Sequence, residues 1–189
     1  MTRSVKASAI VCRLLATAAM TWLAILAPSP ATADDNTVRW KTIVGIVDAG
    51  TIIVPPATTP NNAVGGITGG GQAWTTLGGD ARVNLGSGDL EFEVRGLVLA
   101  GGNAIGTPDG ITQVKGTLVC AAGTPAQAVV DGAPVPLSAQ GDAEFDGNLG
   151  SLPASCTPTA VAFLVRIANG ANAGRWIANG AVRISNGDH

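Results

Sequence analysis

Residues 90–95 read Leu-Glu-Phe-Glu-Val-Arg, a strict alternation of apolar and charged side chains. Successive side chains of a β-strand point to opposite faces, so this period of two predicts a strand with Leu90, Phe92 and Val94 on one face. The charged side chains between them predict that the other face meets solvent. A single half-buried strand needs further strands to cover its apolar face, and the rest of the chain supplies them.

The same alternation recurs along the chain, in residues 38–47, 114–120, 142–146 and 161–167. Beyond residue 33 no apolar pattern with helical spacing lasts three turns without a glycine or proline. The chain has 26 glycines and 11 prolines in 189 residues, and many of them form turn clusters between the alternating segments. About nine short strands at this spacing predict an all-β fold, an antiparallel Greek-key sandwich or barrel.

The C-terminal segment carries the strongest local turn signal, because Asn179-Gly180 lies between two apolar runs. Asn-Gly between such runs is typical of a two-residue hairpin turn. In that hairpin Ile177 faces Val182, and Trp176 faces Arg183 on the opposite side. We therefore expect a cation–π contact of Arg183 over Trp176, which would stabilise the hairpin by about 0.5 to 1 kcal/mol if exposed.

The first 33 residues have the order of a secretory signal. Arg3 and Lys6 precede an uncharged run over 14–27, and Ala31-Thr32-Ala33 provides a small-residue cleavage site after Ala33. The run is too short to span a membrane, and we expect no transmembrane span after cleavage. This predicts a signal peptide over 1–33, a single β-sandwich domain over 34–189, and a protein that is secreted or periplasmic.

Two cysteines remain after residue 33, Cys120 and Cys156. An exported chain meets an oxidising compartment, so one intramolecular disulfide between them is the expected state. On the chain-entropy estimate it stabilises the fold by about 3 to 4 kcal/mol.

Charge and composition exclude several classes of function. The net charge is −2, and loss of the three basic residues of the signal, Arg3, Lys6 and Arg13, lowers it to −5. Nucleic acid is therefore a poor partner, because phosphate binding needs clustered lysine and arginine. The only histidine is the last residue, His189, which argues against Ser-His-Asp and zinc sites. We expect no catalytic residue and no cofactor.

Tryptophan is the residue type most suited to ligand contact in this chain. Trp74 follows a glycine run, and Trp176 lies on the outer face of the expected hairpin beside Arg183. Either ring can serve as a platform for a sugar or a peptide if it is exposed. The alternative is that both tryptophans pack in the core, as we expect for the three phenylalanines.

Carboxylates supply two further candidate sites. Asp142, Glu144 and Asp146 form an acidic strand edge, and oxygen ligands of this kind can hold Ca²⁺. Glu91 and Glu93 lie two apart on one strand face, about 7 Å between Cα atoms, within the range of paired glycosidase carboxylates. Strand alternation alone explains both sets as solvated faces, so each hypothesis competes with a simple structural role.

Several segments carry a resemblance to known proteins: residues 65–74, 96–100, 114–120, 135–138, 141–143 and 156–164. In these segments the chain resembles small exported bacterial all-β proteins of unassigned function, and more remotely the CHRD type of extracellular β domain. That resemblance implies a β fold and a disulfide, and it carries over no catalytic residue. The histidines usual in CHRD domains are missing here.

Together these features predict an exported, non-enzymatic binding or structural β-domain of the bacterial envelope or medium. Its partner is an unknown ligand or an envelope component, and an open sheet edge leaves room for a homo-oligomer. Two alternatives stay open: a carbohydrate- or calcium-binding module, and a carboxylate-dependent hydrolase.

Overall fold

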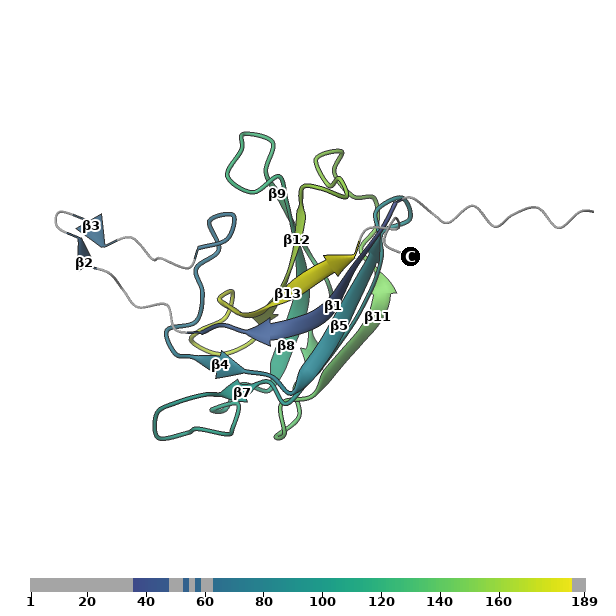
Figure 1. The fold of residues 1–189 in the computed structure, drawn as a ribbon. Coiled ribbons are helices and arrows are strands. Elements are labelled where there is room, and N and C mark those ends of the chain that lie inside the picture. The colour runs from purple at the N-terminus through teal and green to yellow at the C-terminus, as the bar shows by residue number, and fades with distance from the viewer. Residues whose placement is uncertain (1–35, 48–52, 55–56, 59–62, 185–189) are drawn as a thin grey trace, which may run out of the picture. The chain divides into compact units, whose positions relative to one another are not determined.

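The alternating segments form strands in the computed structural model, which describes residues 36–47, 53–54, 57–58 and 63–184 (Figure 1). The signal and the domain boundary predicted at residue 33 lie outside these residues, as does His189. The described residues contain no helix and thirteen strands. The strands are β1 (Thr37–Gly45), β2 (Ile53–Val54), β3 (Ala57–Thr58), β4 (Trp74–Thr75), β5 (Gly78–Asn84), β6 (Asp89–Arg95), β7 (Val98–Leu99), β8 (Gln113–Cys120), β9 (Ala128–Asp131), β10 (Val135–Pro136), β11 (Ala143–Asn148), β12 (Val161–Ile167) and β13 (Trp176–Ile184).

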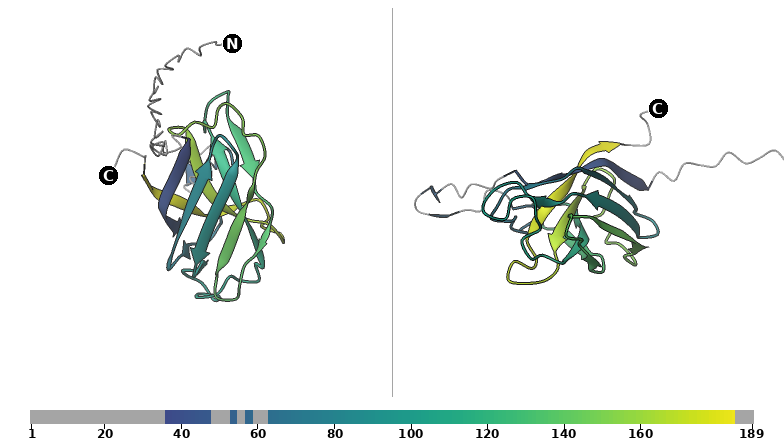
Figure 2. Two further views of the ribbon diagram at one scale, coloured as in Figure 1. Left: turned by 90° about the vertical axis from the view of Figure 1, so that its right-hand side faces the viewer. Right: turned by 90° about the horizontal axis from the view of Figure 1, so that it is seen from below.

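Nine of these strands form one antiparallel sheet in the order β10-β8-β12-β13-β1-β5-β6-β11, with β9 also paired to β8. The sheet curls into a half-barrel, and Figure 2 shows its β1, β5, β6 and β11 side wall. Several neighbours are distant in sequence, such as β13 beside β1 and β8 beside β12, as Greek-key connections require. The predicted all-β antiparallel fold is confirmed, in its barrel-like form.

Four aromatic rings fill the inside of the half-barrel. Trp40 lies 5.7 Å from Phe163, Phe163 lies 5.3 Å from Phe92, and Phe92 stacks on Phe145 at 5.9 Å between ring centroids. This row joins β1, β12, β6 and β11, and all four residues are buried. Gly116 of β8 leaves space for these rings. A Cβ atom added at this position would lie 2.7 Å from the Phe92 ring, too close for the ring to keep its place. The expectation that the phenylalanines form the core is confirmed.

Strand β8 is buried on both faces, which the alternation alone did not indicate. The predicted inward residues Val114, Leu118 and Cys120 are buried, but so are Thr117 and Val119 on the outer face. Gly65, which precedes β4, lies against this outer face. Gln127 Nε2 donates a 2.8 Å hydrogen bond to the Gly65 carbonyl, and a side chain on Gly65 would meet Val119. Gly65 thus covers part of the Val119 side chain, which would otherwise face water.

The predicted C-terminal hairpin is wrong. Strand β13 runs unbroken through Asn179-Gly180, and Gly180 pairs with Ile43 of β1. The reason is Trp40, since a Cβ atom on Gly180 would lie 2.6 Å from Trp40 Cγ. Glycine is needed at this position for the ring to lie against the strand, so Asn-Gly serves packing and not a turn.

The disulfide prediction is confirmed: Cys120 and Cys156 are joined, with 4.7 Å between their Cα atoms. Both are buried, and the bridge fixes the connection before β12 to the end of β8. Within the described residues, no helix has the length and apolar character that crossing a membrane requires.

Candidate functional site

A small cavity lies beside the β4–β7 strand pair, with a volume of about 60 Å³. Its floor is apolar. Trp74 of β4 pairs with Leu99 of β7, and Ile167 at the end of β12 packs beside them. These three side chains are almost fully buried, and Ile111 is partly buried at the wall. The floor therefore belongs to the core and is held rigidly by it.

Polar side chains from three separate loops surround this floor. Gln72, Asp109, Asn172 and Arg175 line the cavity, and all four are solvent-exposed. Arg175 Nη1 donates a 3.2 Å hydrogen bond to the Gly69 carbonyl, which fixes the guanidinium near the cavity. Among the described residues neither Asp109 nor Arg175 forms an ion pair. A carboxylate and a guanidinium are therefore both open to a ligand at the mouth of an apolar pocket.

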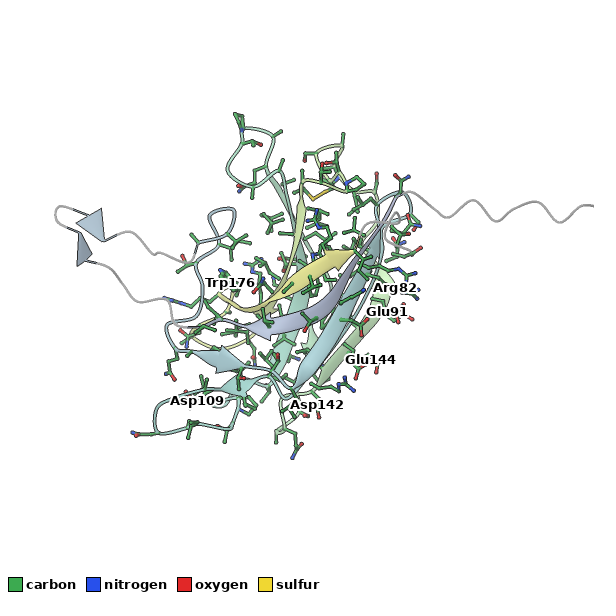
Figure 3. The ribbon with its side chains drawn as sticks, viewed as in Figure 1. Arg82, Glu91, Asp109, Asp142, Glu144 and Trp176 are labelled. Atoms are coloured by element: carbon green, nitrogen blue, oxygen red, sulfur yellow. A yellow bond between two sulfur atoms is a disulfide. The ribbon has the colours of Figure 1, made fainter. Side chains whose placement is uncertain are left out.

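The backbone of Asp109 is held in an unusual conformation. Its φ is +50°, within the turn formed by Pro108, Asp109 and Gly110. Aspartate tolerates this left-handed region better than most residues. The turn is also held by its backbone, because the main-chain N–H of Asp109 donates to Thr107 Oγ1 at 3.2 Å. Asp109, labelled in Figure 3, lines both the cavity and a second hollow.

Two larger, shallower hollows adjoin the cavity on either side. One, of about 490 Å³, shares Gln72 and Asp109 with it, and the other, of about 380 Å³, shares Arg175. The three hollows are neighbours, because they share these lining residues. We call them together the β4–β7 groove; they are lined by residues of segments 66–74, 99–111 and 166–175.

The indole nitrogen of Trp74 borders the cavity. Nε1 lies 3.4 Å from the position that a Cβ atom on Gly70 would take, and Gly70 lines the same cavity. Among the described residues the only buried side-chain nitrogen or oxygen atom without a hydrogen-bond partner is Asn169 Oδ1, so Nε1 is not a buried, unsatisfied donor. The Trp74 indole N–H therefore meets solvent at the cavity, where it can donate to an oxygen that enters.

The two tryptophans predicted as exposed platforms are not exposed. Trp74 is 4% and Trp176 7% exposed, because both pack into the core. The predicted contact of Arg183 over Trp176 is wrong as well. Arg183 lies instead 5.8 Å from the Trp40 ring and donates a 2.5 Å hydrogen bond to the Pro158 carbonyl. Of the three predicted ligand-binding residues, only Trp74 lines the groove.

The acidic edge predicted as a calcium site lies on the outer face of β11, away from the groove. Asp142, Glu144 and Asp146 alternate with inward residues, and Asp142 Oδ1 accepts a 2.9 Å hydrogen bond from the Gly96 N–H. Among the described residues no group of three histidine, cysteine or acidic side chains could hold a metal ion. Strand alternation spreads these carboxylates along the sheet, so the structure offers the calcium hypothesis no support.

The carboxylates Glu91 and Glu93 lie on the outer face of β6. Glu91 forms an ion pair with Arg82 of β5, and Glu93 lies 3.6 Å from Arg95. Figure 3 shows Arg82 and Glu91 together on the flank of the sheet, far from Asp109. A hollow of about 220 Å³ borders Glu91, but its lining is mostly charged and polar, with Leu90 as its one apolar residue. These carboxylates act as partners of surface cations, as expected for a solvated face.

A second polar cluster forms on Asp131 of β9. Its carboxylate accepts hydrogen bonds from Lys115 Nζ at 2.6 Å, Thr117 Oγ1 at 2.7 Å and Arg166 Nη1 at 2.8 Å. Burial raises the pKa of Asp131, but the hydrogen bonds from Lys115 and Thr117 and the charge of Arg166 together hold it below 3.8. Every member of this cluster has a partner, so its role is to join β8, β9 and β12.

No family model, curated protein or solved structure matches this chain. The resemblance to exported bacterial β-proteins and to CHRD domains thus stays a prediction. The function has to be argued from the site alone.

Sequence reasoning missed most of the groove. Asp109, Arg175, Gln72 and Asn172 lie in segments that the sequence marks only as glycine-rich or proline-containing turns. The one available signal was the position of Trp74 three residues after the glycine run 69–71, which indicated a large apolar side chain at a loop end. Which loops meet there depends on strand order, which periodicity does not give.

Proposed function

We propose that this protein is an exported, non-enzymatic ligand-binding β-domain, and that its ligand lies in the β4–β7 groove. The observation that carries the proposal is the combination found there: a cavity floored by buried apolar side chains, bordered by an unpaired carboxylate and an unpaired guanidinium. An apolar pocket with a few convergent polar groups is the usual form of a small-molecule site.

Export supports a binding role outside the cytoplasm. The signal-like order of residues 1–33 predicts secretion or a periplasmic location, and the Cys120–Cys156 disulfide suits an oxidising compartment. The groove is a surface feature on a rigid half-barrel, so ligand binding needs no rearrangement of the core.

A thermal-shift screen of the disulfide-bonded protein tests the proposal, with oligosaccharides and short peptides as the two panels. A ligand at about 100 times its Kd adds roughly 2.7 kcal/mol to the free energy of unfolding. For a domain of this size that is a rise in Tm of about 5 to 11 °C.

A variant pair locates the site. Gly71→Leu places a side chain at the cavity, where a Cβ atom would meet no atom within 4 Å and the backbone conformation is ordinary. Ala122→Leu makes a comparable change on the exposed turn between β8 and β9. We expect ligand-induced shifts to disappear in Gly71→Leu and to persist in Ala122→Leu. Equal shifts in both variants, or no shift with either panel in the unaltered protein, would refute the groove as the binding site.

A further inference from the structure

The cavity in the β4–β7 groove is small enough to restrict what enters it. Its volume of about 60 Å³ holds roughly four to six waters, at about 10 to 15 Å³ for each water. A chemical group of roughly the same number of non-hydrogen atoms would replace them. A whole sugar ring or an aromatic side chain is too large, so the cavity accepts one substituent of a ligand whose remainder lies along the groove.

The lining requires that this substituent has an apolar part and an oxygen. Leu99 and Ile167 present only carbon to the cavity, and burying a polar group against them without a partner is unfavourable. Trp74 adds its indole N–H, which borders the cavity beside Gly70. A purely apolar substituent would leave this donor unpaired, at a loss of about 1 to 3 kcal/mol.

We propose that the cavity binds the acetamido group of an N-acetylated hexosamine, with neighbouring sugars of the glycan lying along the groove. This inference rests on the function proposed above. The acetamido methyl packs on Leu99 and Ile167, and its carbonyl oxygen accepts a hydrogen bond from Trp74 Nε1. Its N–H points back toward the mouth of the cavity, where the Asp109 carboxylate is an acceptor.

The remainder of the groove suits a ligand rich in hydroxyl groups. Its walls include the side-chain amides of Gln72, Asn103 and Asn172, together with the exposed backbone of Gly101 and Gly102. Amides both donate and accept hydrogen bonds, as hydroxyl groups do. The larger hollows on either side of the cavity leave space for the sugars before and after the acetylated one.

Anionic substituents fit the cavity less well. A carboxylate or phosphate at the floor would lose its hydration against Leu99 and Ile167. The nearby cation, Arg175, is solvent-exposed and already donates to the Gly69 carbonyl. Arg175 is better placed to contact the ligand outside the cavity.

Three tetrasaccharides that differ at one substituent test this inference by isothermal titration calorimetry. They are the β-1,4-linked tetramers of N-acetylglucosamine, of glucosamine and of glucose, used with the disulfide-bonded protein. We expect the acetylated tetramer to bind at least tenfold more tightly than either of the others, and its binding to change tryptophan fluorescence.

Variants assign the preference to the cavity. Trp74→Phe keeps an aromatic ring but removes the N–H, and we expect it to weaken binding of the acetylated tetramer about tenfold. Gly71→Leu should abolish binding, whereas Ala122→Leu should leave it unchanged. If Trp74→Phe does not fold, Gly71→Leu still decides whether the cavity is used.

The outcomes separate this inference from the proposed function. Equal binding of all three tetramers, lost in Gly71→Leu, would overturn the acetamido assignment and leave the groove as a binding site. Binding of peptides alone, lost in Gly71→Leu, would do the same. Binding that Gly71→Leu does not alter, or no binding of any probe, would overturn both.

Discussion

The packing of Trp40 against Gly180 predicts that a single added methyl group destabilises the protein. In Gly180→Ala the new Cβ atom would lie 2.6 Å from Trp40 Cγ, and Trp40 is 3% exposed and held by Phe163 on its other side. Overpacking of this kind costs about 1 to 3 kcal/mol. Replacing glycine within a strand recovers about 0.5 to 1 kcal/mol. We therefore expect a net loss of about 1 to 2 kcal/mol, which lowers Tm by about 2 to 8 °C.

Urea unfolding followed by circular dichroism measures the loss in the free energy of unfolding. Three further variants show whether contact with Trp40 causes it. Gly71→Ala is a matched control, because its added Cβ atom meets nothing within 4 Å; we expect it to be neutral or slightly stabilising. Trp40→Ala alone should lose about 3 to 5 kcal/mol. In the Trp40→Ala background, Gly180→Ala should cost nothing, because the ring that it would strike is gone.

The double-mutant cycle distinguishes strand packing from turn formation. If Gly180 occupied a two-residue turn with positive φ, alanine would be unfavourable there whether or not Trp40 is present. A Gly180→Ala penalty of the same size in both backgrounds would refute the packing explanation. A coupling energy of about 1 to 3 kcal/mol between the two positions would support it.

Three further expectations concern stability. Replacing both Cys120 and Cys156 by alanine should lower the free energy of unfolding by about 3 to 4 kcal/mol for a sequence separation of 36 in the chain-entropy estimate; a loss below 1 kcal/mol in urea unfolding would contradict it. Ala121→Gly should stabilise the protein by about 1 kcal/mol, because Ala121 has a φ of +47°, and a lower Tm would show that the methyl group has another role. Asp131 has a lowered pKa in the folded state, so its ionised form stabilises the fold above the unfolded value of 3.8, and this stabilisation is lost as the pH falls through the lowered value. Asp131→Asn should accordingly make the free energy of unfolding change less between neutral and strongly acidic pH, and identical acid profiles for the two proteins would contradict this.

The sequence predicts strand faces well because burial follows the period of two. Leu90, Phe92 and Val94 are buried as the alternation requires, and Phe163 and Ile167 are buried in β12. The disulfide was predictable for a different reason: the two cysteines beyond residue 33 allow one pairing if the chain is exported, as its first 33 residues predict. Neither inference depends on which strands are neighbours.

The failures arise where a residue serves a partner distant in sequence. Asn179-Gly180 has the local signature of a turn, but Gly180 is needed by Trp40, about 140 residues earlier in the chain. The register of the predicted hairpin placed Trp176 on the outer, solvent-facing side. Because β13 instead continues as one strand between β12 and β1, Trp176 is buried and Arg183 reaches Trp40.

The groove was beyond sequence reasoning for the same physical reason, and the fold explains why it is held firmly. Strand β4 is fixed to the end of β1, because the backbone N–H of Trp74 donates to the Ile46 carbonyl at 2.7 Å and Thr76 Oγ1 donates to the Ile43 carbonyl at 2.7 Å. Strand β4 can come this close to β1 only because residue 45 is glycine. A Cβ atom added at Gly45 would lie 2.7 Å from the Thr75 backbone nitrogen.

Glycine therefore acts in this protein less through turns than through the close approach that a missing side chain permits. At Gly116 and Gly180 it admits aromatic rings to the interior, and at Gly45 it brings a backbone strand against β1. The first two sites build the core, and the third attaches the cavity floor to that core. The β4–β7 groove is made largely of turns, and it is held in place because Trp74 of its floor is anchored to the sheet by backbone hydrogen bonds.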